Sequence, residues 1–411
     1  MKFQNQDKFK GLGFVDIITS YGNEDDLHNL RYDHFELEYR KATEMVNCVI
    51  LKPTKACNAD CSYCYAPPID GNKWDLDKFK KFFLKIEPYL LKDAIFVWHG
   101  GEPMMMGANF YRDAREFVNF RGRRDISFTM QTNLLKYSTE KWKNIFKDIF
   151  NGNISTSYDP DETNRTIKGD SVKYNKIFKQ KLTQYLSDGF SVMLISVFGK
   201  NNIDYADDLL NMAIEYNNHN YHVVPKFNRL FAGGRQKDAS NLLEKGEYGL
   251  LLCHLLDRWV DEELNFPISP LDSLIRAFNS PHLKTCPWNN SCAGSILNIE
   301  TNGDVYGCDD IKSIEQSEGE YCYGNLNDNW VSELLNSQNF RKMSSRSYSY
   351  PAECGHCDFF SVCRGGCVKD AIAAGGVDAA IFDCQSWKLV FNKIFELSQK
   401  GKLDNIIKII N

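Results

Sequence analysis

Residues 48–64, CVILKPTKACNADCSYC, join a short β-branched run to a loop that holds three cysteines. The run at 48–51 predicts a buried strand, and the apolar spacing at 76–91 predicts a helix after the loop. The same alternation continues along the chain. It predicts strands at 94–98, 126–130, 154–158, 192–197 and 221–224, with helices near 109–120, 138–150, 172–188 and 203–217. Six strands alternating with helices predict an α/β fold with a parallel sheet, since a parallel return needs a crossover.

Periodicity alone leaves two architectures open, a doubly wound sheet and a partly closed barrel. In both, ligands bind at the carboxyl ends of the strands. The pattern changes after about residue 230, where a long helix is expected at 242–264, and the last helical stretch is expected at 386–410. These changes divide the chain into five segments: an extension of unknown function at 1–45, the βα repeat at 46–235, a helical bridge at 236–283, a cysteine-rich region at 284–390 and a terminal helix at 391–411.

Composition restricts the classes of function. The chain has 411 residues, 43% of them apolar, and a net charge of −5, which disfavours nucleic acid and anionic membranes as partners. The longest apolar stretch, residues 249–256, is too short to span a membrane, and the polar start MKFQNQDKFKGLGF does not resemble a signal peptide. We therefore expect a cytoplasmic protein, in which the fourteen cysteines are metal or cluster ligands before they are disulfides.

The first cysteine group is Cys57, Cys61 and Cys64, in the loop after the first predicted strand. Three thiolates can hold one cuboidal iron–sulfur cluster and leave one of its irons without a protein ligand. The alternative is a zinc site. With three sulfurs and no neighbouring histidine, zinc would lack its usual fourth ligand. The spacing therefore favours a cluster with an open iron.

This CxxxCxxC loop, with an aromatic residue before its last cysteine and a βα repeat around it, resembles the radical S-adenosylmethionine (SAM) enzymes. The resemblance implies a partial (β/α)6 TIM-like barrel and a [4Fe-4S] cluster whose open iron chelates S-adenosyl-L-methionine. It also implies reductive cleavage of SAM to a 5′-deoxyadenosyl radical, which abstracts a hydrogen atom from the substrate.

Further segments match this family residue by residue. HGGEP at 99–103 resembles the motif that holds the methionine amino group, with Gly100, Gly101 and Glu102 as its members, although a simple turn would explain GGE as well. The two glycines would let the backbone approach a ligand closely. Tyr63 matches the aromatic residue near the adenine, with core packing as the alternative.

The stretch SYDPDETNR at 157–165 follows the fourth predicted strand and resembles a segment in which Ser157 contacts the ribose and Arg165 the carboxylate. It is shorter than in the best-known relatives. Gln131 and Asn133, with Thr132 between them, complete a polar ring after the third strand, and Phe227 is a candidate adenine neighbour. A purely structural role is the alternative for these last positions.

The second cysteine group includes ECGHCDFFSVCRGGC at 353–367 and GxxxxC at 303–308. Its order resembles the cysteine-rich, loop-rich SPASM extension of radical SAM enzymes, which implies two auxiliary [4Fe-4S] clusters and three clusters in all. By that match one auxiliary cluster is held by Cys286, Cys292, Cys308 and Cys367, and the other by Cys354, Cys357, Cys363 and Cys384. A zinc site that includes Cys363 and Cys367 is the alternative. Cys48, Cys253 and Cys322 remain outside these sets.

SPASM enzymes mostly modify polypeptides, so the resemblance implies a precursor peptide or protein as substrate and an external one-electron donor such as a flavodoxin or ferredoxin. The preferred interpretation is a maturase of ribosomally made peptides that forms a side-chain crosslink, either a C–C cyclophane or a thioether. The alternative is an anaerobic sulfatase-maturing enzyme that makes formylglycine from serine or cysteine. In that group an aspartate directly after the third extension cysteine is the catalytic base, and Asp309 stands there, although it could be an ordinary turn residue.

The extension at 1–45 is the argument against the sulfatase-maturing interpretation, because those enzymes tend to begin almost at the cluster loop. It is shorter than a winged-helix leader-binding domain, and strand addition is one way in which it could hold a leader peptide. A second alternative is an electron-transfer protein without catalysis of its own. HGGEP and Ser157 disfavour that alternative, since a carrier has no use for a methionine pocket.

Overall fold

The computed structural model describes residues 46–411 except 67–70, 238, 280–285, 287 and 290–291, so the predictions made for residues 1–45 lie outside the described residues. The described chain forms two compact units that interleave along the sequence. One, here called the sheet unit, comprises described residues within 43–242 and 293–341. The other, here called the helical unit, comprises described residues within 243–292 and 342–411.

The sheet unit contains the six predicted parallel strands, which confirms the expected α/β class. They are β1 (Val46–Leu51), β2 (Leu90–Trp98), β3 (Ser127–Thr132), β4 (Asn153–Ser157), β5 (Ser191–Phe198) and β6 (His222–Arg229). Each strand pairs with the next one along the chain, in the order β6-β5-β4-β3-β2-β1. Strand order does not reverse as in a doubly wound sheet, so the topology is that of a partial barrel.

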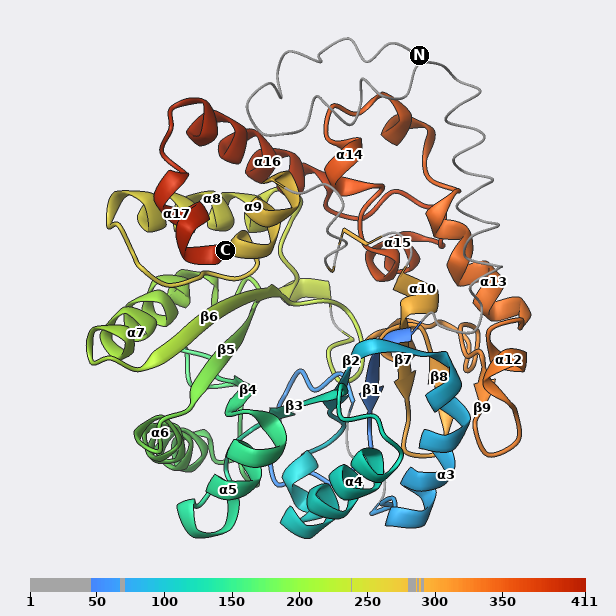
Figure 1. The fold of residues 1–411 in the computed structure, drawn as a ribbon. Helices are drawn as coiled ribbons and strands as arrows, with labels where there is room; N and C mark the ends of the chain where they lie inside the picture. Colours follow the sequence, from blue (N-terminus) through green and yellow to red (C-terminus); the bar gives the residue numbers. More distant parts are fainter. Residues whose placement is uncertain (1–45, 67–70, 238, 280–285, 287, 290–291) are drawn as a thin grey trace. The chain divides into compact units, whose positions relative to one another are not determined.

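Helices connect these strands along one side of the sheet (Figure 1). They are α3 (Leu76–Ile86), α4 (Ala108–Phe120), α5 (Thr139–Phe150), α6 (Ser171–Ser187) and α7 (Ala206–Asn218). The Asp75 side chain caps α3 by accepting a hydrogen bond from the Lys78 backbone N–H at 2.7 Å. The α-helix ends at Ile86, earlier than predicted, and passes into a 3-10 turn over Glu87–Tyr89, because Pro88 has no backbone N–H to continue the α-helical hydrogen bonds. β2 then begins at Leu90, before its predicted start.

Aromatic rings fill much of the core between the sheet and these helices. Phe96 of β2 stacks on Phe128 of β3 with ring centroids 5.8 Å apart. Trp98 meets Tyr111 of α4 edge to face at 5.2 Å. Since each buried aromatic side chain removes a large apolar area from water, this packing fixes the positions at which the strands end.

Three short strands extend the sheet beyond β1, and the sequence did not predict them. They are β7 (Ile296–Ile299), β8 (Asp304–Tyr306) and β9 (Gly324–Asn325). β7 pairs in parallel with β1, and β8 and β9 follow antiparallel. Strands of two to four residues are too short to show alternation, so region 284–390 gave no strand signal. This extension places the loop after β8 beside the end of β1.

The helical unit is built around α8 (Glu247–Asp261) and α16 (Cys384–Gln399). The two helices approach closely at Gly249, whose N–H donates to Ser386 Oγ at 2.8 Å. The predicted helix at 386–410 is instead two helices, because Gly401 takes a φ of 67° and ends the first. The other helices of this unit are α9 (Leu271–Asn279), α14 (Phe360–Cys363), α15 (Val368–Ala374) and α17 (Asp404–Ile410).

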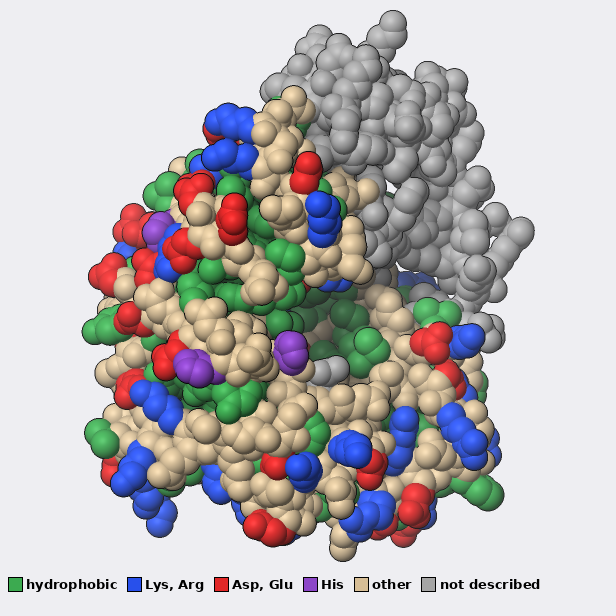
Figure 2. All heavy atoms as spheres, turned by 60° about the vertical axis from the view of Figure 1, so that its left-hand side comes forward, with side chains coloured by type: hydrophobic (Ala, Val, Ile, Leu, Met, Phe, Trp, Pro, Cys, Tyr) green, Lys and Arg blue, Asp and Glu red, His purple; other side chains and the backbone are tan. Residues whose placement is uncertain are grey.

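Short helices complete the described chain: α10 (Cys292–Ser295), α11 (Ile311–Ile314), α12 (Val331–Leu334) and α13 (Gln338–Ser344). Among the described helices, none has the length and apolar character that crossing a membrane requires. On the face shown in Figure 2, acidic and basic side chains are interspersed and do not gather in one basic area.

Candidate active site

The loop with Cys57, Cys61 and Cys64 begins directly after β1, at the carboxyl end of the sheet. Backbone hydrogen bonds hold it from several sides. The Gly101 N–H donates to Thr54 O at 2.9 Å, and the Asp60 N–H donates to Thr166 O at 2.8 Å. The Arg235 N–H donates to Cys64 O at 2.9 Å. Segments after β2, β4 and β6 therefore position this loop.

N–H groups surround the sulfur atoms of this loop. The Ala59 N–H donates to Cys57 Sγ at 3.4 Å, and Asn133 Nδ2 donates to the same sulfur at 3.9 Å. Arg165 Nη1 donates to Cys61 Sγ at 4.0 Å. Burial raises the pKa of Cys57 to about 12, and burial likewise raises the pKa of Cys61 and Cys64. These thiols need a bound cationic centre to ionise, and the N–H donors suit the sulfurs of an iron–sulfur cluster.

In the described part of the chain, no group of three or more His, Cys, Asp or Glu side chains is arranged around a single metal ion. The cysteines of the loop nevertheless interact electrostatically with one another, since Cys61 and Cys64 both act on Cys57. The donor set thus fits a multi-iron cluster held by three cysteines. When bound, such a cluster supplies the electron for cleavage of SAM.

Glu102 is fully buried and holds one end of the predicted methionine site. Its Oε1 accepts hydrogen bonds from the Met104 N–H at 2.8 Å and Thr132 Oγ1 at 2.7 Å, and its Oε2 accepts from the Asn133 N–H at 2.7 Å. A carboxylate has about four acceptor positions. Burial raises the pKa of Glu102 to about 7, although these hydrogen bonds oppose the shift. One acceptor position on Oε2 remains for an ammonium group.

Glycine is required at the two positions before Glu102, because a Cβ at either one would clash with neighbouring backbone. A Cβ at Gly100, where φ is 115°, would lie 2.5 Å from Thr54 O. A Cβ at Gly101 would lie 2.4 Å from Ala56 O. The expected close approach is therefore to the backbone that leads into the cysteine loop. The two glycines therefore let the backbone after β2 pack closely against the backbone after β1, independently of any ligand.

The polar ring predicted after the third and fourth strands is present as two contacts. Gln131 Nε2 donates to Ser157 Oγ at 2.8 Å, which joins the ends of β3 and β4. Asn133 Nδ2 donates to Asn58 Oδ1 at 2.8 Å, which joins β3 to the cysteine loop. The structure brings these four side chains to the same edge of the sheet as Glu102. Their contacts with SAM remain predictions.

Tyr63 and Arg165 lie together, with a third residue that the sequence did not single out. Arg165 Nε forms an ion pair with Asp159 Oδ2 at 2.9 Å, and the Tyr63 hydroxyl donates to the same carboxylate oxygen. The Arg165 guanidinium also donates to the Tyr63 hydroxyl. Arg165 thus has a carboxylate partner of its own, and its predicted contact with the SAM carboxylate remains untested. Asp159 stands two residues after Ser157, within the SYDPDETNR stretch.

Phe227 is fully buried in β6, and its ring stacks on Phe198 at a centroid distance of 5.6 Å. This contact belongs to the core of the sheet unit. The structure thus gives Phe227 a packing role, and its predicted position beside the adenine remains a prediction.

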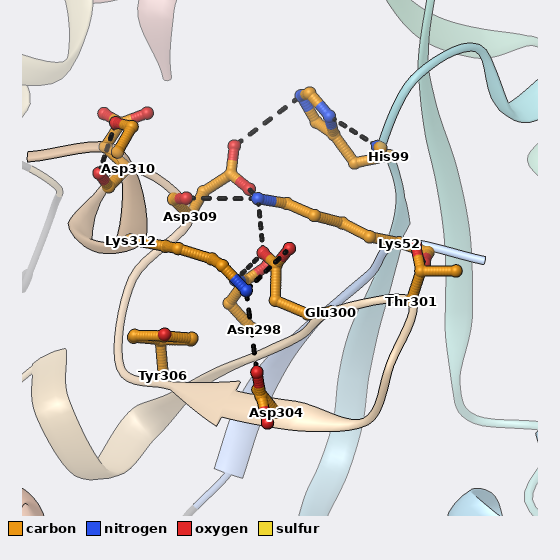
Figure 3. Close-up of polar contacts among 12 residues, drawn as sticks. Lys52, His99, Asn298, Glu300, Thr301, Asp304, Tyr306, Asp309, Asp310 and Lys312 are labelled. Carbon is orange, nitrogen blue, oxygen red and sulfur yellow. Dashed lines mark hydrogen bonds and ion pairs between the residues drawn. The ribbon is translucent and has the colours of Figure 1, made fainter. Parts of the chain in front are cut away.

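Asp309 lies in the loop after β8 and is the centre of a polar cluster, most of which is drawn in Figure 3. Its Oδ1 lies 2.8 Å from Lys52 Nζ, and its Oδ2 accepts a hydrogen bond from Tyr65 Oη at 2.8 Å. His99 Nε2 lies 3.7 Å from Oδ2. Lys52 also pairs with Glu300 Oε1 at 2.9 Å. The Asp309 cluster is hereafter Asp309, Lys52, Tyr65, His99 and Glu300.

The charges in this cluster compensate one another. Burial by itself raises the pKa of Asp309, but the Lys52 ammonium and hydrogen bonds from Lys52 and Tyr65 outweigh it and hold the pKa below its ordinary value. Burial lowers the pKa of His99, so its ring is neutral near pH 7. The Gly100 N–H donates to His99 Nδ1 at 2.8 Å, which assigns the ring proton to Nε2, on the side of Asp309. Asp309 is therefore an ionised carboxylate with ordered neighbours.

Sequence reasoning identified Asp309 but missed the other four members of the cluster. Lys52 directly follows the first strand, Tyr65 directly follows the last cysteine of the loop, and His99 opens the quoted HGGEP segment. Each position was therefore beside a recognised motif. Glu300 could not be found in this way, because it follows β7, which the sequence did not predict.

The auxiliary cysteines fall into two neighbourhoods in the helical unit. Cys354, Cys357 and Cys384 all act electrostatically on Cys363, and burial raises the pKa of Cys363 to about 12. Cys286 and Cys292 act on Cys367 in the same way, after burial as the main cause of its raised pKa. These groups match the two predicted ligand sets, except that Cys308 belongs to the sheet unit. The ligand assignments remain predictions.

Comparisons with known proteins give the same family. The SPASM family, described as an iron-sulfur cluster-binding domain, matches residues 286–358. The serine-type anaerobic sulfatase-maturating enzyme of Bacteroides thetaiotaomicron is 26% identical over 384 residues, which cover 84% of this chain and 89% of that protein. The cysteine-type enzyme of Clostridium novyi is 26% identical over 366 residues, covering 84% and 94%.

The fold is similar to that of anSMEcpe, solved with bound AdoMet and Cp18Cys peptide. The TM-score is 0.73 at 19% identity, and the match covers 86% of this chain and 98% of that structure. Fold, cysteine loop and relatives together define a radical SAM enzyme with a C-terminal SPASM domain. Within that class the chain is a maturase, an enzyme that acts on a peptide or protein with SAM and [4Fe-4S] clusters, and not an electron carrier.

Proposed function

We propose that the enzyme oxidises a serine or cysteine side chain of a protein substrate to formylglycine, as expected of an anaerobic sulfatase-maturing enzyme. The observation that carries this proposal is Asp309, a partly buried, ionised carboxylate with 20% of its side chain exposed at the carboxyl end of the sheet. Relatives of both the serine and the cysteine type match over more than 80% of this chain. They favour this proposal over the crosslinking maturase that the sequence suggested first.

The proposed oxidation removes two electrons and two protons from the substrate side chain. The β-carbon gives one hydrogen atom to the adenosyl radical, and the hydroxyl or thiol gives its proton to Asp309. An auxiliary [4Fe-4S] cluster, when bound, would accept the remaining electron. With serine the aldehyde forms directly, whereas with cysteine the thioaldehyde exchanges its sulfur for the oxygen of water and releases hydrogen sulfide.

Asp309 is suited to accept this proton because of the residues around it. Lys52 holds Oδ1, so Oδ2 faces Tyr65 and His99. A hydroxyl next to a carbon radical is more acidic than that of the parent alcohol, so a weakly basic carboxylate suffices when electron removal accompanies proton transfer. Tyr65 and His99 keep Oδ2 oriented and exclude competing partners from it. We assign the supply of the first electron to an external one-electron donor of the flavodoxin or ferredoxin type.

The experiment uses the anaerobic holoenzyme with dithionite, SAM and two synthetic peptides copied from a sulfatase, one with serine and one with cysteine at the target position. We expect an aldehyde that reacts with a hydrazide reagent, together with 5′-deoxyadenosine. A crosslink would also remove two hydrogens, but it would not react with hydrazide. Hydrazide-negative products with both peptides and with full-length sulfatase would contradict the proposal.

The Asp309→Asn variant tests the role of the carboxylate. It should still form 5′-deoxyadenosine, while aldehyde formation falls about 10²- to 10⁴-fold, the usual contribution of a positioned general base. Asp304→Asn is the matched control, since Asp304 lies on β8 of the same hairpin and pairs with Lys312 at 3.5 Å. Equal aldehyde yields from both variants would remove Asp309 from the mechanism.

A further inference from the structure

The helical unit contains a buried guanidinium that forms no ion pair with a carboxylate among the described residues. Arg346 has a relative exposure of 0%. Its Nη1 donates to Val377 O and to Ala379 O, both at 2.9 Å, and its Nη2 donates to Gly365 O. All of these acceptors are neutral backbone carbonyls. Asp378 acts on the guanidinium electrostatically, but among the described residues no ion pair or hydrogen bond joins Arg346 to a carboxylate.

One donor of this guanidinium is left over. Arg346 Nε is buried and has no hydrogen-bond partner among the described residues. A buried N–H without an acceptor costs about 1–3 kcal/mol, and more when the group is charged. Burying an unpaired cation is also strongly unfavourable. The combination requires an anionic acceptor that the described side chains do not supply.

The surroundings of Arg346 identify the chemistry of this acceptor. Gly365 lies between Cys363 and Cys367, and a Cβ at Gly365 would be 3.4 Å from Arg346 Nη2. The guanidinium also interacts electrostatically with Cys354, Cys363 and Cys367. These cysteines come from both predicted auxiliary ligand sets. A [4Fe-4S] centre held by four thiolates carries a net negative charge, and its sulfurs accept hydrogen bonds.

We propose that Arg346 is the counter-cation of the auxiliary clusters, and that its Nε–H donates a hydrogen bond to a sulfur of the cluster held by Cys354, Cys357, Cys363 and Cys384. The proposal rests on the predicted ligand sets and not on the identity of the substrate. A hydrogen bond and a positive charge both favour the reduced, more negative cluster. Arg346 therefore makes this cluster a better acceptor for an electron from the substrate radical.

The test measures auxiliary-cluster potentials in the full-length, iron-loaded protein. A C57A/C61A/C64A background removes the signal of the first cluster. Arg346→Gln keeps a donor for the carbonyls but removes the charge, and Arg341→Gln removes a charge at an exposed position as the matched control. At a fixed applied potential, Arg346→Gln should lower the ratio of reduced to oxidised auxiliary cluster at least tenfold. This corresponds to a fall of about 59 mV in the reduction potential for a one-electron couple. Arg341→Gln should leave the ratio unchanged.

A direct measurement covers the case in which Arg346→Gln does not fold or does not load iron. Protein labelled with ¹⁵N in the arginine guanidino groups should show a ¹⁵N coupling to a reduced auxiliary cluster in pulsed EPR, and Arg346→Lys should lose it. Unchanged potentials in fully loaded Arg346→Gln would overturn the proposal. Absence of any ¹⁵N coupling in the labelled C57A/C61A/C64A protein, where Arg165 no longer lies beside a cluster, would overturn it as well.

Discussion

Lys52 in the sheet unit and Arg346 in the helical unit are both buried cations, but their surroundings differ. Lys52 has two carboxylate partners, Asp309 at 2.8 Å and Glu300 at 2.9 Å, and these raise its pKa despite its burial. Arg346 contacts backbone carbonyls only. Burial of charge is tolerated where a partner of opposite charge is present. The Asp309 cluster is therefore complete within the protein, whereas in our proposal an auxiliary iron–sulfur cluster completes the surroundings of Arg346.

The largest expected effect tests whether the Asp309 cluster can form without the iron–sulfur cluster of the first cysteine loop. Replacing Cys57, Cys61 and Cys64 with alanine should abolish formation of 5′-deoxyadenosine, because the cluster with the open iron has no other predicted ligands. Iron analysis should still find the auxiliary clusters. The Asp309 cluster should persist, because none of its members is a predicted ligand of the iron–sulfur cluster. Cleavage of SAM by this variant would contradict the assignment of the first loop.

The next prediction concerns the ion pairs of Lys52 with Asp309 and Glu300. Lys52→Met leaves two buried carboxylates without their cation, which should destabilise the holoenzyme by about 3–5 kcal/mol in denaturant unfolding. A Lys52→Met/Glu300→Gln double variant removes one of the two unpaired charges and should recover part of this loss. Lys143→Met is the control, because its pair with Asp188 at 3.0 Å is more exposed and should contribute about 0–1 kcal/mol. Equal losses for Lys52 and Lys143 would mean that burial does not distinguish the two pairs.

A pH effect is expected at Glu102, the other buried carboxylate of the site. Its pKa of about 7 means that the carboxylate, which is predicted to bind the SAM ammonium, becomes neutral as the pH falls through this value. Equilibrium binding should therefore show SAM affinity about tenfold weaker at pH 6 than at pH 7.5. Glu102→Gln should bind weakly at both values without this dependence. A wild-type affinity that is flat over this range would remove Glu102 from ammonium binding.

Sequence patterns predicted the local motifs of the site, but they did not predict which residues distant in the sequence meet at Asp309. The cysteine loop, the six parallel strands and HGGEP each depend on a few neighbouring residues, so spacing identifies them. Lys52 and Asp309 are 257 residues apart in the chain, and they meet only because β7 pairs with β1. That pairing depends on strands of two to four residues, which carry no periodic signal. The partners of Asp309 were therefore beyond sequence reasoning.

The smallest expected effect concerns the hydrogen bond from Tyr65 to Asp309. Tyr65→Phe removes one donor but leaves Lys52 in place, so Asp309 stays ionised while the orientation of Oδ2 is less restricted. Aldehyde formation should fall about three- to tenfold, with no change in 5′-deoxyadenosine formation, since a positioning contact contributes less than the base itself. Tyr137→Phe is the matched control, because Tyr137 donates to Asp188 at 2.6 Å in the same unit. A similar fall in Tyr137→Phe would show that the loss is one of general stability, and the Asp309 cluster would then owe its order to Lys52 alone.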